Sequence, residues 1–372
     1  MCLDAWLTIL QAVHPGSPGV VELLRAQGTA ANVVALPRRD LMAVGLDTKT
    51  VARLKSPDAD LLADWSRWLE RPGHTLVTVD SPGYPPLLQE LPDPPLALWS
   101  VGARLDLLQA PQLAMVGSRN PTRSGRDTAE RFAHYLSDRG LTITSGLATG
   151  IDGAGHRGGL AGAAGTVAVL GSGLDVIYPA THHALAQNII ADGLLISEYP
   201  PKTPPRSLHF PQRNRIIAGL SVGTLVVEAA RRSGSLITAR LAADYGREVF
   251  AIPGSIHSPL AKGCHRLIKD GAKLVEDAAD VLVELPSLLQ FPNRAEAAAV
   301  EPEIDSDSIT AQPGYPQLLQ AMDFEPCSLS QMSERTGLTT AELSSMLLLL
   351  ELEGFVEALP GGLYSRLPKR SA

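Results

Sequence analysis

The stretch Leu113-Ala114-Met115-Val116, followed at once by Gly117-Ser118-Arg119, decides the fold of the central part of this chain. An apolar run that ends in a small-residue turn is typical of a strand buried on both faces of a parallel sheet. A helical segment follows at 124–139, and the next apolar run, 141–144, ends in a second small turn, Ser145-Gly146. Strands that alternate with helices indicate an α/β domain with a mostly parallel sheet.

Four more apolar runs continue this rhythm. They cover 166–170, 194–198, 224–228 and 248–252, and the first of them is followed by Gly171-Ser172-Gly173. Crossovers between parallel strands are right-handed, so the carboxyl ends of the strands share one edge of the sheet. The three small turns are therefore expected to meet at the edge where open α/β sheets bind ligands.

The flanking segments have different patterns. Residues 1–72 show apolar residues at helical spacing and are predicted to form a helical domain, either a plain bundle or an interaction module. The Pro-rich residues 73–110 are predicted to connect it, as an ordered segment with a short strand at 96–99, to an α/β domain over 111–290. An acidic linker is predicted over 291–314, and 315–368 have the helix, helix, helix, hairpin order of a winged helix. Its third helix has few basic residues, so protein contact, or no DNA role, fits this domain at least as well as DNA binding.

Composition limits the possible functions. The chain has 372 residues and a formal net charge of −7, which excludes a uniformly basic DNA-coating protein but allows a local basic groove. Cys2, Cys264 and Cys327 are far apart and odd in number, which argues against a disulfide framework or a zinc site. We expect no metal and no cofactor. The first residues lack the basic start of a secretory signal, and no apolar run is long enough to span a bilayer, so the prediction is a cytoplasmic protein without a membrane partner.

The most informative segment is 202–240, which has seven Lys and Arg residues and a single acid, Glu228. Such a local excess of positive charge in an acidic chain is typical of a phosphate-binding groove. Phe210 stands beside Arg213-Asn214-Arg215, and an aromatic ring next to arginines suits unstacked bases. The alternative interpretation is a solvated basic face with a helix cap at Ser233.

The small turns add anion-binding capacity, because their backbone N–H groups approach a ligand closely and a helix N-terminus follows. Each turn is also explained by tight-turn geometry alone, and Arg119 by an ordinary surface position; Tyr178 either stacks on a base or fills the core. The predicted DNA- or phosphate-binding residues are Gly117, Ser118, Arg119, Ser145, Gly146, Gly171, Ser172, Gly173, Phe210, Arg213, Asn214, Arg215, Ser233, Gly234, Ser235 and Arg240.

Catalytic signals are weak. Asp152 and His156 are spaced to share one helix face, and they form either an acid/base or metal pair or a helix-start aspartate beside a hydrogen-bonded histidine. The chain has no Gly-x-Ser-x-Gly elbow, no Walker lysine, no HExxH string and no dinucleotide glycine fingerprint. We therefore predict no catalytic residue and a protein that is not an enzyme.

These strings together resemble the DprA/Smf family of DNA-processing proteins. The matching strings are MVGSR at 115–119, SGLATGID at 145–152, VLGSGLDVIYP at 169–179, ISEYPP at 196–201, FPQRNRIIAGLS at 210–221, VVEAARRSGSLITAR at 226–240, REVFAIPG at 247–254 and GCHRLIKDGA at 263–272.

The resemblance implies a Rossmann-like core, an N-terminal SAM-like helical domain and a C-terminal winged helix. It implies a homodimer that binds single-stranded DNA through the turns and arginines named above, protects incoming DNA, and loads the RecA recombinase onto it during natural transformation. Two positions depart from the family pattern, since His182 and His265 stand where the family usually has Asn. Neither departure removes an arginine, so DNA binding is expected to persist.

The main alternative is a nucleotide phosphoribohydrolase of the LOG type, which has a similar core. Such enzymes carry a PGGxGTxxE string, whereas Ser221-Val222-Gly223-Thr224 lacks PGG and Glu228 is one residue too far along. On a strand, a slip of one residue turns the side chain to the opposite face. A second alternative, an interaction scaffold whose α/β domain binds no ligand, is disfavoured by the unbalanced arginines.

Overall fold

The computed structural model describes residues 2–13, 19–285, 314–322, 326–352, 355–359 and 361–367. The chain forms two compact units, Met1–Gln290 and Phe291–Ala372. Most of the predicted acidic linker, residues 291–313, lies outside the described residues.

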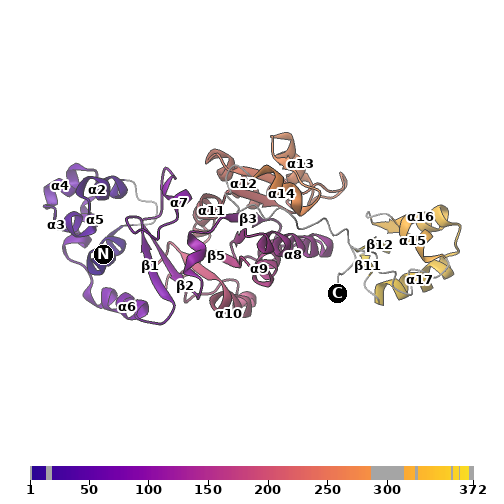
Figure 1. The fold of residues 1–372 in the computed structure, drawn as a ribbon, viewed down its shortest axis with the longest axis horizontal. Helices are drawn as coiled ribbons and strands as arrows, with labels where there is room; N and C mark the ends of the chain where they lie inside the picture. The colour runs from indigo at the N-terminus through magenta and orange to yellow at the C-terminus, as the bar shows by residue number, and fades with distance from the viewer. Residues whose placement is uncertain are drawn as a thin grey trace. The chain divides into compact units, whose positions relative to one another are not determined.

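The first unit is built on a nine-stranded sheet with the order β1-β2-β6-β5-β4-β3-β7-β8-β9 (Figure 1). The strands are β1 (His74–Thr78), β2 (Ala97–Val101), β3 (Gln112–Val116), β4 (Thr142–Ser145), β5 (Thr166–Leu170), β6 (Leu194–Ser197), β7 (Gly223–Val226), β8 (Glu248–Ala251) and β9 (Lys273–Leu274). All neighbours from β6 to β9 pair in parallel, whereas β1 and β2 are antiparallel additions. The predicted mostly parallel α/β sheet is thus confirmed.

The chain reverses its direction of travel across the sheet at β3. It moves outward through β4, β5 and β6, and then returns to the other side of β3 to form β7. Ligands of open α/β sheets bind outside the carboxyl ends of the strands at such a reversal. The fold therefore places the candidate site beyond Val116 of β3, between the segments that follow β4 and β7.

Residues 73–110 contribute more to the sheet than the predicted connecting segment with a short strand at 96–99. They supply β1 and β2, and β2 pairs with β6 through Trp99 and Ser197. The prolines from Pro82 to Pro95 lie between the two strands, around the short helix α7 (Pro86–Gln89). Proline has no N–H to donate, but outside the strands this costs the sheet no hydrogen bond. The 3₁₀ turn η1 (Leu105–Leu108) then leads into β3.

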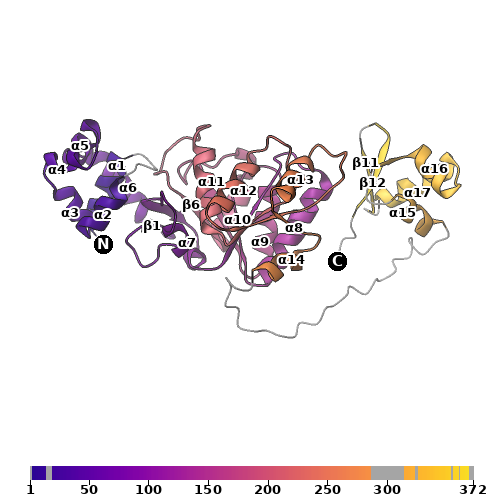
Figure 2. The same ribbon diagram turned by 90° about the horizontal axis from the view of Figure 1, so that it is seen from above.

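Helices cover both faces of the sheet, because successive strand side chains point to opposite sides. Leu113 and Met115 of β3 pack in the cluster that contains Leu136, whereas Ala114 and Val116 pack in the cluster that contains Ile216. The helices are α8 (Arg123–Asp138), α9 (Ile151–Ala161), α10 (His183–Asp192, after the 3₁₀ turn η2, Ala180–His182), α11 (His209–Leu220), α12 (Ser235–Asp244), α13 (Lys262–Lys269) and α14 (Ala278–Glu284). Helices α11 and α12 lie side by side near the carboxyl end of β3 (Figures 1 and 2).

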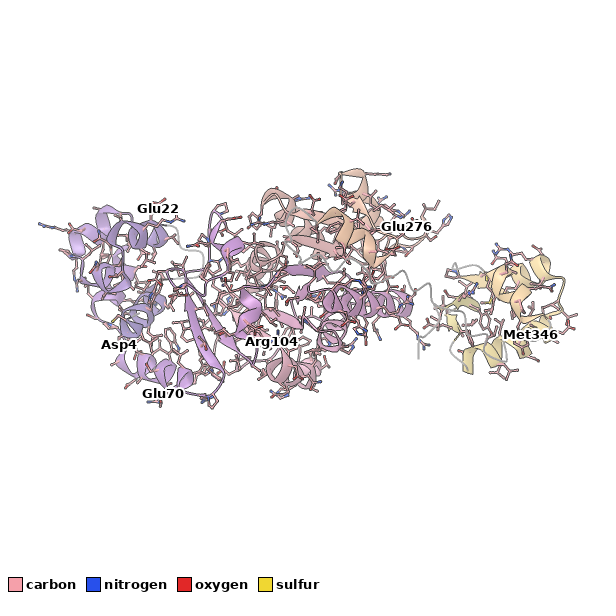
Figure 3. The ribbon with its side chains drawn as sticks, viewed as in Figure 1. Asp4, Glu22, Glu70, Arg104, Glu276 and Met346 are labelled. Atoms are coloured by element: carbon pink, nitrogen blue, oxygen red, sulfur yellow. The ribbon has the colours of Figure 1, made fainter. Side chains whose placement is uncertain are left out.

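The N-terminal segment is helical, as predicted. Its helices are α1 (Leu3–Ala12), α2 (Val20–Gln27), α3 (Ala30–Ala35), α4 (Arg38–Ala43), α5 (Thr48–Lys55) and α6 (Ala59–Leu69). Trp65 and Trp68 of α6 pack edge-on against Trp99 of β2, with ring centroids 5.4 and 5.6 Å away, so this segment shares a core with the sheet. Acidic side chains such as Glu22 and Glu70 project from its outer surface (Figure 3).

The second unit has the predicted order of three helices and a hairpin. The elements are α15 (Tyr315–Met322), β10 (Cys327–Ser328), α16 (Leu329–Thr336), α17 (Thr340–Leu352), β11 (Val356–Leu359) and β12 (Leu363–Arg366), with the strands in the order β10-β12-β11. Leu318, Met332, Leu343 and Leu347 bring the three helices together in one buried cluster, against which Met346 (labelled in Figure 3) also packs.

Candidate nucleic-acid interface

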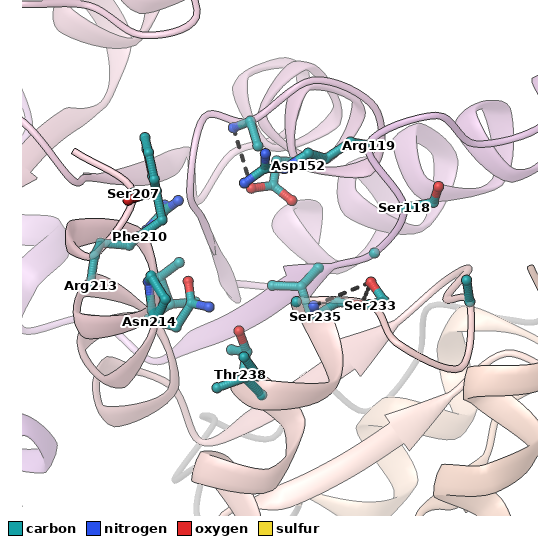
Figure 4. A pocket seen from close by; sticks show the side chains of 18 of the residues that line it. Ser118, Arg119, Asp152, Ser207, Phe210, Arg213, Asn214, Ser233, Ser235 and Thr238 are labelled. Carbon is teal, nitrogen blue, oxygen red and sulfur yellow. Dashed lines mark hydrogen bonds between the residues drawn. The ribbon is translucent and has the colours of Figure 1, made fainter. Parts of the chain in front are cut away.

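A pocket of about 710 Å³ opens at the strand reversal beside β3. It is called the α11–α12 pocket here, and its walls come from the turn after β3, the loop after β4, α11 and α12 (Figure 4). It brings together nine of the residues predicted from the sequence: Gly117, Ser118, Arg119, Phe210, Arg213, Asn214, Ser233, Gly234 and Ser235. Its other walls include Ala148, Asp152, Tyr178, Pro205, Ser207, Ile237 and Thr238.

The turn after β3 holds Arg119 at the mouth of the pocket. Gly117 is required there, because a Cβ atom would lie 2.7 Å from the Ile151 side chain and 2.9 Å from the Glu228 carbonyl oxygen. Arg119 is exposed, and its guanidinium carbon lies 5.9 Å from the centroid of the Phe210 ring. It makes no ion pair with any residue that the structure describes, so its charge is available to a ligand.

The turn after β4 lies behind the pocket wall and positions an arginine. Ser145 is buried and donates to the Met115 carbonyl oxygen at 2.6 Å. A Cβ atom on Gly146 would lie 1.7 Å from Nη1 of Arg213, so the guanidinium packs directly on the glycine backbone. The Asp152 carboxylate accepts hydrogen bonds from the N–H groups of Gly146 and Ala148, which fixes the turn.

Arg213 is a buried cation that lines the pocket. Its side chain is only 4% exposed, and Nη1 donates to the Val169 carbonyl oxygen at 2.6 Å. Its Nε has no hydrogen-bond partner among the described residues, although a buried donor ordinarily finds one. Burial lowers the pKa of Arg213 to about 10, against the opposing pull of Asp152, so the guanidinium stays charged at neutral pH.

Arg215 lies elsewhere, contrary to the prediction. Its Nη2 donates to both carboxylate oxygens of Glu198, at 2.6 and 2.7 Å, and its Nη1 donates to the Asp93 carbonyl oxygen at 2.7 Å. Two residues along a helix correspond to a rotation of about 200°, so Arg213 and Arg215 point in opposite directions. Arg215 is therefore part of a buried ion pair and does not line the pocket.

The turn after β5 supports an aromatic ring and does not line the pocket. A Cβ atom on Gly171 would lie 3.2 Å from the Phe210 ring, and one on Gly173 would lie 2.6 Å from the Pro200 carbonyl oxygen. Ser172 is buried and donates to the Val176 carbonyl oxygen. Tyr178 follows this turn, is 50% exposed, and lies 5.5 Å from Phe210 between ring centroids, so the two rings form one aromatic edge of the pocket.

The segment before α12 forms the opposite edge. The hydroxyls of Ser233 and Ser235 are 2.7 Å apart, and Ser233 Oγ also accepts the N–H of Ser235 at 3.3 Å. Since α12 begins at Ser235, its N-terminal N–H groups and dipole favour an anion at this edge. Arg240 lies further along α12 and lines a different groove, so the structure does not place it in this pocket.

Comparison with known proteins agrees with this architecture. A family model described as DNA recombination-mediator protein A matches residues 75–286, and a model of the DprA winged helix domain matches 298–362. The chain belongs to the DprA family. It is 42% identical to Protein Smf of Escherichia coli over 329 residues, which is 88% of this chain and 86% of that protein. It is 50% identical to DNA processing protein DprA of Streptococcus pneumoniae over 201 residues, 54% of this chain and 71% of that one.

Two solved DprA structures share the fold. The X-ray structure of DprA from Streptococcus pneumoniae aligns with a TM-score of 0.66 and 39% identity over 75% of this chain and 95% of that chain. A structure of DNA processing protein A from Helicobacter pylori, reported for its single-stranded DNA binding mode, aligns with a TM-score of 0.51 and 31% identity over 54% of this chain and 92% of that chain. The Rossmann-like core and the C-terminal winged helix are thereby confirmed, and the protein is a DNA-processing protein of this family.

Within this DprA fold, His156 is a structural residue. The side chain is fully buried, and its Nε2 accepts the Leu147 N–H at 3.2 Å. Its Nδ1–H donates to Thr166 Oγ1 at 2.8 Å, and the Thr166 hydroxyl donates in turn to the Ile143 carbonyl oxygen. Burial lowers the pKa of His156 to about 3, so the ring is neutral. Among the described residues, no group of three His, Cys, Asp or Glu is arranged to hold a metal ion. Of the two interpretations of Asp152 and His156, the contacts favour the hydrogen-bonded structural pair.

The two histidines that depart from the DprA pattern also bind backbone. His182 Nδ1 lies 3.0 Å from the Leu147 carbonyl oxygen, and His265 Nε2 lies 2.9 Å from the Gly254 carbonyl oxygen. Either contact needs only one N–H donor, which an Asn amide also supplies. Neither histidine lines the α11–α12 pocket.

Among the described helices, none has the length and hydropathy of a membrane span.

Proposed function

We propose that this chain binds single-stranded DNA in the α11–α12 pocket. The observation that carries the proposal is that one pocket joins Arg119, which is exposed and forms no ion pair with a described residue, the Tyr178–Phe210 aromatic edge and the N-terminus of α12. Anion-binding groups and base-sized aromatic surface are the two components of single-strand grooves. The Helicobacter pylori relative, known for its single-stranded DNA binding mode, supports the same ligand.

The pocket suggests how the strand is held. Phosphates bind the backbone of Gly117 and Ser118, the Arg119 fork, and the Ser233–Ser235 edge, while Arg213 supplies positive charge from behind the wall. Bases stack on Tyr178 and Phe210. Stacking of this kind needs bases that are free of a duplex partner, so the pocket favours a single strand over a double strand.

The wider role that we propose follows from the family. The protein acts in the cytoplasm as a homodimeric recombination mediator, which protects incoming single strands and loads RecA onto them during natural transformation. Membership in the DNA recombination-mediator family and the identity to DprA of Streptococcus pneumoniae support this role.

We also propose that the protein is not an enzyme, so that the phosphoribohydrolase alternative does not apply. The acid that would be needed, Glu228, is engaged elsewhere: its carboxylate accepts the Thr122 N–H at 2.9 Å and the Thr122 hydroxyl at 2.7 Å. Thr122 in turn accepts the Gly125 N–H and caps α8. Glu228 thus serves to tie α8 to the segment after β7.

Fluorescence anisotropy with matched single- and double-stranded oligonucleotides tests the binding proposal. We expect the single strand to bind more tightly, and Arg119→Ala to weaken it several-fold and reduce the slope of log K against log salt by about 0.7, the value for one phosphate contact. Arg119→Lys should retain most of the slope, and Arg157→Ala, an exposed arginine outside the pocket, should leave it unchanged. Equal affinity for the single- and double-stranded oligonucleotides, or an unchanged single-strand affinity of the Arg119→Ala variant, would overturn the proposal. Hydrolysis of nucleoside monophosphates by the purified protein would revive the enzymatic alternative.

A further inference from the structure

A second groove continues from the α11–α12 pocket along the other side of α12. It lies between α12 and α13 beside β8 and has a volume of about 740 Å³. It is called the arginine groove here, after the arginines in its lining: Arg231, Arg232, Arg240, Arg247 and Arg266. Ser233 and Ile237 line both cavities, so the arginine groove begins where the pocket ends.

Three of these arginines form no ion pair with a described residue. Arg247 donates to Glu90 at 2.7 Å, and Arg266 lies 3.5 Å from Asp270. Arg231, Arg232 and Arg240 are exposed, and their side chains have no hydrogen bond or ion pair within the described part of the chain. The acids Glu248 and Asp270 also line the groove, but five arginines outnumber them, and in a chain with net charge −7 this local excess of positive charge favours a polyanion as the occupant.

The spacing suits a polynucleotide that leaves the pocket. Arg240 lies five residues after Ser235 on α12, an axial distance of about 7.5 Å. That is roughly the length of two nucleotides at about 3.4 Å each in a stacked strand. Ile237 lies between them, is 43% exposed, and offers an apolar contact to a base or sugar.

We infer that the single strand bound in the α11–α12 pocket continues through the arginine groove, with its phosphates on Arg231, Arg232 and Arg240. An acidic protein surface would satisfy the same charges. The shared lining at Ser233 and Ile237 favours the DNA strand, because a chain that leaves the pocket over the start of α12 enters the groove directly. The inference rests on the proposed single-strand binding and adds its path and length.

Oligo-dT of graded length tests the path. Anisotropy would be measured for lengths from about 4 to about 16 nucleotides, the range of single-strand site sizes. The test variant carries Arg231→Ala, Arg232→Ala and Arg240→Ala. A matched control carries Arg25→Ala, Arg38→Ala and Arg71→Ala, which removes three exposed charges from the N-terminal helical segment. A third variant replaces Arg231, Arg232 and Arg240 with Lys, and thermal unfolding checks that each variant folds.

We expect the Ala variant to bind the shortest oligomer as the unmodified chain does, and the longest about tenfold more weakly, with a salt slope lower by about 2. The Lys variant and the matched control should retain the longer binding site. Unchanged affinity at every length, or an equal loss at every length, would overturn the inference. Failure of the unmodified chain to bind any oligomer would instead overturn the proposed function, and the inference with it.

Discussion

Helix α11 carries two arginines, Arg213 and Arg215, that are both buried and yet belong to different regions of the molecule. Arg213 faces the α11–α12 pocket, and its Nε has no hydrogen-bond partner among the residues that the structure describes. Arg215 faces the inside of the fold, where Glu198 and Asp93 occupy its donors. The same local string, Arg-Asn-Arg, thus supplies one residue to a binding surface and one to the layer behind it. The charge of an arginine does not reveal whether it lies on the binding surface or in a buried ion pair. The hydrogen-bond partners in the fold reveal it.

The largest expected effect comes from breaking the inner layer. Arg215→Ala leaves the Glu198 carboxylate buried and without its main cation, and losing one member of a buried pair typically costs about 3–5 kcal/mol. Urea unfolding should show this loss of stability. Arg231→Ala, at an exposed arginine without an ion pair in the described ranges, serves as the control and should change stability by no more than about 0.5 kcal/mol. If Arg215→Ala kept its stability but lost DNA affinity, Arg215 would have to be assigned to the binding surface.

A second test of the inner layer uses pH. Because burial lowers the pKa of His156 to about 3, below the roughly 6.5 of an exposed histidine, the unfolded chain takes up the extra proton. Stability contributed by this residue is therefore present above pH 6.5 and is lost as the pH falls toward 3. Below pH 6.5 the free energy of unfolding is expected to fall by about 1.4 kcal/mol per pH unit, which amounts to about 2 kcal/mol at pH 5.

His156→Gln isolates this contribution, because an amide can accept from Leu147 and donate to Thr166 but does not titrate in this range. Urea unfolding at pH 7 and pH 5 should show a smaller fall in stability for the variant than for the unmodified chain. Equal falls would mean that His156 is already protonated in the fold or is not buried.

On the pocket side, the aromatic edge should matter most for affinity. Phe210→Ala removes a stacking surface and should weaken single-strand binding by about 1–3 kcal/mol, the range for one stacked base. Phe210→Tyr keeps the ring and should retain most of the affinity. The salt slope should stay the same for both variants, since no phosphate contact is lost. A reduced slope in Phe210→Ala would mean that the ring acts by holding Arg119, which lies 5.9 Å from its centroid.

The sequence allowed the α/β class, the positions of the parallel strands from β3 to β8 and nine of the residues that line the pocket to be predicted, because each small turn follows an apolar run and the strand ends must share an edge. Two things escaped it. Strand β1 was hidden in a segment whose prolines turn out to lie between β1 and β2, whereas the strand at 96–99 was expected. Partner choice was also invisible, because Glu198, which pairs with Arg215, is 17 residues away in the chain. Tyr178 was left between two interpretations, since only its exposure and its distance to Phe210 place it on the pocket wall.

The smallest change in DNA affinity is expected for substitutions in the winged helix, whose third helix we compare with the proposed DNA-binding surface of the α/β domain. Its third helix, α17, has no Lys or Arg, and its exposed side chains include Glu342, Leu348 and Leu349, the two leucines 58% and 44% exposed. A recognition helix that enters a groove of DNA is accompanied by cations that contact phosphate. Leu348→Ala together with Leu349→Ala should therefore leave single- and double-strand affinity unchanged within about twofold, by the same anisotropy assay. A tenfold loss in a variant with normal thermal unfolding would put α17 on the nucleic acid, and the α/β pocket would then not be the only binding surface.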